Sequence, residues 1–153
     1  MGDVFGKILG VILAFILCIM APLTIVAMSD DMADRRAIYS DITNLIDQTI
    51  DTGEITEQQL RSFLYAVSSH GPVCDVKITR QMRVVNPSSD GGTVTTYVPT
   101  DMFIDGAPMH FNSGDLIQIS VKAVEYTGAQ RIARLSIGQA LQPIDYTVAG
   151  RIR

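Results

Sequence analysis

An uncharged apolar run, Ile8 to Met28, is the longest feature in the pattern of hydrophobic and polar positions. Lys7 precedes this run, and Asp30 and Asp31 follow it. At about 1.5 Å per residue, a helix of this length spans about 30 Å, the thickness of the hydrocarbon core of a bilayer. A cleaved secretion signal has a shorter apolar region and ends in small residues, whereas this run ends in Ile25-Val26-Ala27-Met28. We therefore expect a retained membrane-spanning helix over residues 8–28.

The membrane or assembly face of this helix is expected to comprise Ile8, Ile12, Phe15, Ile19, Pro22 and Ile25. Pro22 removes one backbone hydrogen bond, which fits either a mild kink without function or a helix shaped to pack obliquely among copies of itself. The Lys and Arg residues on the two flanks are nearly balanced and lean slightly towards the opposite orientation. Because residues 1–7 form only a short tail, we expect this tail in the cytoplasm and the C-terminal part outside the cell membrane.

Apolar residues continue beyond the run, but on one helical stripe only: Ile38, Ile42, Leu45, Ile46 and Ile50. No glycine or proline interrupts the chain between Pro22 and Gly53. The spacing predicts a single helix from Ile8 to about Ile50, apolar all round in its first half and packed by one face on a domain in its second half. Glycine is a frequent helix terminator, so Gly53 is its expected end.

A second helix is predicted between Thr56 and Gly71. Thr56 suits the N-cap, and Gln59 three residues later completes a capping-box pattern. Its buried stripe is expected to be Leu60, Phe63, Leu64 and Val67, and the pair Gly71-Pro72 stops the helix.

After Pro72 the apolar positions alternate with polar ones, which is typical of half-buried strands. The first predicted strand has Val76, Ile78, Met82 and Val84 on one face, and it forms a hairpin with residues 93–98 through the turn at 86–92. Residues 99–115 are expected as loop. Two further strands carry Ile117, Ile119, Val121 and Ala123, and then Ile144, Tyr146, Val148 and Ile152. Residues 130–137 fit a short helix or a strand.

The predicted fold class is therefore α+β: a long N-terminal transmembrane and amphipathic helix, a second packed helix and an antiparallel sheet of about four strands. We expect four segments along the chain. They are a cytoplasmic tail (1–7), a transmembrane helix (8–28), a helical stalk with the second helix (29–71) and an extracytoplasmic β domain (72–153).

Charge and cysteine content narrow the function classes. The net charge is −4 and no block of basic residues is present, so nucleic acid is not an expected partner. Cys18 lies in the apolar run and Cys74 in the predicted β domain, so a disulfide between them would require one thiol to leave the membrane. Cys74 is expected to be a small, buried apolar residue.

The residues do not indicate catalysis, a metal site or a cofactor. The two histidines, His70 and His110, lie outside any nucleophile or zinc motif, and we interpret them as structural. Asp30 and Asp31 are expected to be solvated residues at the membrane boundary. Residues 51–57 lack the spacing of a calcium loop, and residues 88–92 lack the lysine of a phosphate-binding loop. We expect no small-molecule substrate.

Three stretches together resemble a known family: the amphipathic helix after the apolar run, GEITEQQLRSFLYAVSSHG leading into VCDVKITRQMR, and FNSGDLIQISVKA. They are similar to TadE-like, pseudopilin-like single-span proteins that Gram-positive bacteria encode beside genes for tight adherence or type II/IV secretion. The family-motif positions are Thr56, Gly71, Asp75, Gly114 and Asp115, and the resemblance implies that they are fold positions. The apolar run has no glutamate, unlike that of type IV prepilins, so the sequence does not predict prepilin-peptidase processing.

The resemblance implies a pilin-like, membrane-anchored subunit of a surface filament or secretion-type assembly. Its implied partners are the membrane and either copies of itself or other pilin-like subunits. The alternative is a monomeric, membrane-tethered binding module whose β domain recognises an external partner.

Overall fold

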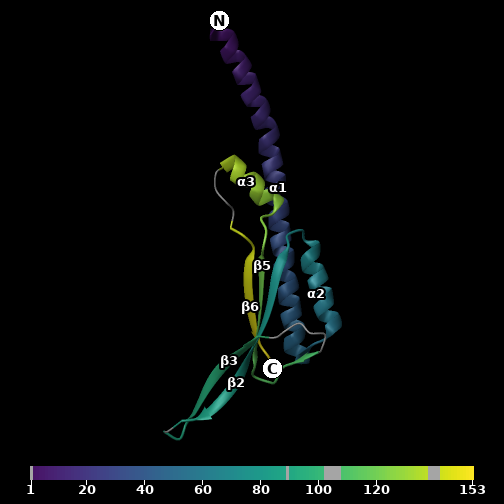
Figure 1. Cartoon of the computed structure of the whole chain (residues 1–153), viewed down its shortest axis with the longest axis vertical. Helices are drawn as coiled ribbons and strands as arrows, with labels where there is room; N and C mark the ends of the chain where they lie inside the picture. Colours follow the sequence, from purple (N-terminus) through teal and green to yellow (C-terminus); the bar gives the residue numbers. More distant parts are fainter. Residues whose placement is uncertain (1, 89, 102–107, 138–141) are drawn as a thin grey trace. The chain divides into compact units, whose positions relative to one another are not determined.

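The computed structural model describes residues 2–88, 90–101, 108–137 and 142–153. It has the predicted α+β class, with a long N-terminal apolar helix, a second helix and antiparallel sheets (Figure 1). The elements are, in chain order, α1 (Gly2–Thr52), β1 (Glu54–Ile55), α2 (Glu57–Ser69), β2 (Cys74–Pro87), β3 (Thr93–Asp101), β4 (Met109–His110), β5 (Leu116–Ala123), α3 (Gly128–Ile137) and β6 (Asp145–Arg151).

Helix α1 continues through Pro22 and ends at Thr52. The N–H of Gly53 donates a 2.8 Å hydrogen bond to the carbonyl of Thr49, and Gly53 has a φ of 71°. This left-handed conformation is accessible to glycine at little cost, so Gly53 ends the helix as expected. The next two residues do not form a simple connection between helices, because β1 pairs with β4 on the predicted loop.

Helix α2 begins with the predicted capping box. The N–H of Gln59 donates to Thr56 Oγ1 at 3.3 Å, and the N–H of Thr56 donates to Gln59 Oε1 at 2.9 Å. These two bonds satisfy backbone donors that have no partner inside the helix. Leu60, Phe63 and Val67 are buried, and Leu64 is partly buried against the same core.

The main sheet has four antiparallel strands in the order β3-β2-β5-β6. In the register of its centre, Ile78 of β2 lies opposite Ile119 of β5, which lies opposite Val148 of β6. Strand β2 pairs with β5 only as far as Gln81, whereas its pairing with β3 continues to Pro87. The end of the β2–β3 hairpin is therefore two-stranded and extends beyond β5 (Figure 1). For this reason Met82, predicted on the buried face, is 36% exposed.

The chain divides into two compact units. Unit 1 comprises Met1–Asp34 and Tyr126–Gln142, and unit 2 comprises Arg35–Glu125 and Pro143–Arg153. In unit 2, the second half of α1 and helix α2 share one core with the sheet. Residues 130–137, for which helix and strand were both open, are helical.

The core of unit 2 lies between the helices and the sheet. The side chains of Ile38, Ile42, Leu45 and Ile46 on α1 are at most 4% exposed. On β5, Ile117, Ile119 and Val121 are fully buried. A buried aliphatic side chain of this size contributes about 1.5–3 kcal/mol, so this single core holds the helix on the sheet.

Gly150 on β6 marks the closest approach of α1 to the sheet. A Cβ atom at this position would lie 2.6 Å from Ile46 Cγ2 and 2.7 Å from Ile50 Cδ1. Only a residue without a side chain therefore fits between the strand and the helix.

Candidate functional site

The apolar segment of α1 is the most extensive candidate surface. Helix residues Val4–Thr52 contain a stretch long and apolar enough to span a membrane, and none of that stretch is buried. All six expected face residues are exposed: Ile8, Ile12, Phe15, Ile19, Pro22 and Ile25. The exposed fraction of Phe15 is 65% and that of Ile25 is 68%. Apolar side chains at this density require cover by lipid or by other protein.

Small residues form one stripe along this segment, a feature that the sequence analysis missed. Gly6, Gly10, Ala14 and Cys18 follow one another at intervals of four. A Cβ atom at either glycine would have no other atom within 4 Å. Small residues at this spacing let two membrane helices approach closely, as in the G-x-x-x-G pattern. Cys18 is a free, exposed thiol on the same stripe.

A buried polar contact joins the two parts of unit 1. Thr127 Oγ1 donates a 2.8 Å hydrogen bond to Asp31 Oδ1, and Asp31 is 5% exposed. The expectation that Asp31 is a solvated residue at the membrane boundary is therefore wrong. Thr127 also accepts a bond from the N–H of Gln130 at 3.2 Å and donates its own N–H to Gln130 Oε1 at 3.1 Å. Helix α3 thus begins with a second capping box, and Asp31 fastens it to α1.

Among the family-motif positions, Asp115 has the densest set of contacts. Asp115 is buried, and its carboxylate accepts hydrogen bonds from Nε of Arg80 at 2.8 Å, from the N–H of Arg83 at 2.9 Å and from the N–H of Asn112 at 3.0 Å. Burial raises the pKa of Asp115, but these hydrogen bonds and the Arg80 charge together outweigh burial and lower the pKa. The sequence indicated only a turn before a strand here, and Arg80 was not singled out.

Gly114 has a φ of 91°, and a Cβ atom there would lie 2.9 Å from Cδ of Arg83. Both the conformation and the space therefore favour glycine. Of the other motif positions, Gly71 has a φ of 95° after α2, and Asp75 is exposed on β2 opposite Lys122 of β5. These contacts and conformations shape turns and strands, and none of the motif positions lines the depression on α2 described below.

Each histidine lies beside a carboxylate of a neighbouring element. His70 Nε2 is 3.0 Å from Asp41 Oδ2, which joins α2 to α1, and His110 Nδ1 is 3.2 Å from Glu54 Oε2 in the β1–β4 pair. Within the described residues, no cluster of three His, Cys, Asp or Glu side chains could hold a metal ion. Cys74 is a free, half-buried thiol, and burial raises its pKa.

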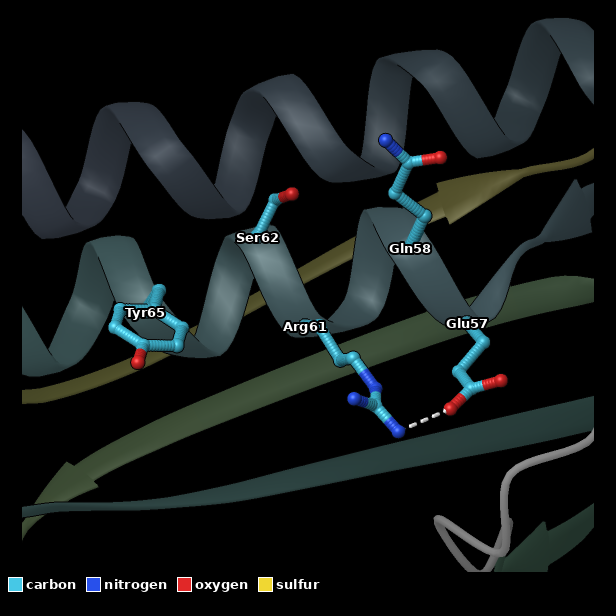
Figure 2. A pocket seen from close by; sticks show the side chains of 5 residues that line it. All are labelled: Glu57, Gln58, Arg61, Ser62 and Tyr65. Carbon is cyan, nitrogen blue, oxygen red and sulfur yellow. Dashed lines mark hydrogen bonds and ion pairs between the residues drawn. The ribbon is translucent and has the colours of Figure 1, made fainter.

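The outer face of α2 carries a shallow depression of about 500 Å³ lined by Glu57, Gln58, Arg61, Ser62 and Tyr65. Figure 2 shows these side chains along one helix, with an ion pair between Arg61 and Glu57 near one end and the ring of Tyr65 towards the other end. Tyr65 is 83% exposed. A depression lined by one helix does not enclose a small molecule, but it resembles the anchor of a protein contact, where tyrosine and arginine are common.

Comparisons of the chain with protein-family models, with curated proteins and with solved structures gave no match.

Proposed function

We propose that the chain is a membrane-anchored, pilin-like subunit that assembles with copies of itself or with similar subunits through its N-terminal helix. The observation that carries this proposal is that none of the apolar stretch in the first half of α1 is buried, in a helix whose second half is built into the core of unit 2. A helix that is apolar all round is stable in lipid or inside a helix bundle, and both environments are proposed for this segment.

The small-residue stripe supports self-association rather than anchoring alone. In lipid, apolar side chains gain little by leaving the bilayer, so helices associate mainly through close packing at small residues. Gly6, Gly10, Ala14 and Cys18 offer such a surface, while the larger Val11 and Phe15 lie off the stripe. The resemblance to TadE-like and pseudopilin-like proteins points to the same role, with the C-terminal part outside the cell and without catalysis.

The native thiol at Cys18 provides the test. Membranes containing the full chain are treated with an oxidant, and a disulfide-linked dimer is sought on a non-reducing gel. We expect a dimer that disappears in Cys18→Ser and is reduced at least several-fold in Gly10→Leu, because leucine blocks close approach. Val11→Leu is the matched control and should crosslink like the unchanged chain. Equal crosslinking in Gly10→Leu, or recovery of the chain outside the membrane fraction and outside sheared surface material, contradicts the proposal.

The α2 depression favours one alternative, a monomeric membrane-tethered binding module. In that case an external partner captured by the full chain is lost in Tyr65→Ala, while Gly10→Leu leaves capture unchanged. If capture is unchanged in Tyr65→Ala and lost in Gly10→Leu, the result supports the proposal that the chain is an assembly subunit.

A further inference from the structure

The free edge of strand β3 has a backbone pattern that the β2–β3 turn defines. The N–H of Ser88 donates to the carbonyl of Gly92 at 2.8 Å, and the N–H of Gly91 donates to the carbonyl of Ser88 at 3.1 Å. Gly91 has a φ of 78°, as in a hairpin closed by a glycine bulge. Ser88 and Gly92 therefore face each other as a hydrogen-bonded pair.

Hydrogen-bonded pairs alternate along an antiparallel ladder. Counting from Ser88 and Gly92, the next such pairs are Asn86 with Val94 and Val84 with Thr96. The remaining residues of β3 direct their N–H and C=O groups away from β2. They are Thr93, Thr95, Tyr97, Pro99 and Asp101, because Val98 and Thr100 continue the pairs that face β2.

Edge strands usually carry charged side chains or prolines that prevent pairing with another strand, and the β3 edge has few of them. Residues 93–100 contain no charged side chain, and all of them are exposed. The single proline, Pro99, is at a position whose N–H would point outward, and it leaves the outward groups at 93, 95 and 97 available. The other edge strand, β6, carries a charged residue at both ends, Asp145 and Arg151, whereas β3 carries one only at its last position, Asp101.

We infer that the β3 edge pairs antiparallel with the β3 edge of a second copy of this chain, about a two-fold axis at Thr96. An antiparallel strand pair is self-complementary, as an isologous interface requires. With Thr96 opposite its own copy, Thr95 pairs with Tyr97 and Val94 with Val98. Val94 is 52% exposed and Val98 is 43% exposed, so this register covers apolar surface with β-branched side chains.

Charge favours a second copy as the occupant. The edge is neutral along residues 93–100, so two copies meet without repulsion between like charges. This contact is separate from the helix surface of the proposed function, because it uses only backbone and side chains of β3. A subunit with both surfaces has two ways to contact copies of itself.

Single cysteines test the contact in the purified full chain in detergent, with Cys18 and Cys74 both replaced by alanine. In a non-hydrogen-bonded pair the two Cα atoms lie about 4.5 Å apart, within disulfide range. Thr96→Cys should therefore form a disulfide-linked dimer on mild oxidation. Val98→Cys is the matched control: its two copies are separated by four residues along the strands, about 13 Å, which is too far for a disulfide.

A second variant tests the backbone. Tyr97→Pro removes one outward N–H without removing a donor from the β2–β3 ladder, and it should lower Thr96→Cys crosslinking at least five-fold. Absence of the Thr96→Cys dimer in a folded protein, or equal crosslinking of Thr96→Cys and Val98→Cys, overturns the inference. Because Cys18 is absent from these proteins, neither result affects the Cys18 crosslinking experiment that tests helix-mediated assembly.

Discussion

The guanidinium of Arg80 on β2 holds the carboxylate of Asp115, with Nε of Arg80 2.8 Å from Asp115 Oδ2. The side chain of Arg80 is 16% exposed and that of Asp115 is 3% exposed. The pair lies where β2 begins to leave β5, next to the turn that precedes β5. It fixes the point from which the β2–β3 hairpin extends.

Asp115→Ala should destabilise unit 2 by about 3 kcal/mol, because it leaves the partly buried Arg80 charge without its carboxylate partner. The measurement is urea unfolding of the full chain in detergent, followed by tyrosine fluorescence. The matched control is Glu57→Ala, which breaks the exposed Arg61–Glu57 pair and should cost less than about 1 kcal/mol. Equal losses in the two variants contradict the prediction.

The stability of unit 2 should also depend on pH through Asp115. The folded-state pKa of this carboxyl is lowered, so its contribution is fully present above the unfolded pKa, about 3.9. It is lost as the pH falls through the folded pKa. We expect the difference in unfolding free energy between the unchanged chain and Asp115→Asn to be constant from pH 7 to pH 5 and to narrow below about pH 4. A difference that stays constant in acid shows that the carboxylate charge does not contribute.

Gly150→Ala should destabilise the fold by about 1–3 kcal/mol through overpacking, because the added methyl meets Ile46 and Ile50. Gly92→Ala is the control, since a Cβ at Gly92 has no other atom within 4 Å, and its effect should stay within about 0.5 kcal/mol. The same urea titration measures both. If Gly150→Ala is as stable as Gly92→Ala, then α1 does not pack against β6 as closely as described.

Asp31→Ala should loosen helix α3 without unfolding unit 2. The substitution removes the acceptor of the Thr127 hydroxyl, whereas Asp31→Asn keeps an oxygen at that place. Amide hydrogen exchange in residues 131–137 should therefore accelerate several-fold in Asp31→Ala and remain close to the original rate in Asp31→Asn. Exchange that is unchanged in Asp31→Ala shows that α3 is held by other contacts.

Local patterns predicted most of the fold. The helical spacing of Ile38, Ile42 and Leu45 predicted the packed half of α1, and the Thr56–Gln59 capping box predicted the start of α2. The alternation from Ile117 to Ala123 predicted strand β5. These patterns act within one element, so a single sequence contains all of the information that they require.

One local pattern was present but was not used. Thr127 and Gln130 have the spacing of Thr56 and Gln59, and they form the same reciprocal bonds. This capping box distinguishes a helix from a strand over residues 128–137. It was sufficient to resolve the two alternatives that periodicity left open.

The contacts that shape the candidate sites were not predictable in this way. Asp31 and Thr127 are 96 residues apart in the sequence, and Arg80 and Asp115 are 35 residues apart. The space above Gly150 is set by Ile46 and Ile50 of a distant helix. Each of these depends on which elements become neighbours, and neither propensity nor periodicity contains that information.

The last strand also bears on how the protein folds in time. Strand β6 is followed by Ile152, which is 3% exposed. The N–H of Ile152 donates a hydrogen bond to the carbonyl of Asp115, and the carbonyl of Ile152 accepts one from the N–H of Gly114. Ile144, just before β6, is fully buried in the same core as Ile38. Contacts between residues so far apart in the chain make folding slow. Helix α1 can form as soon as it is synthesised, but unit 2 cannot close its core until residue 152 has emerged from the ribosome, so its folding is completed after translation of the strands.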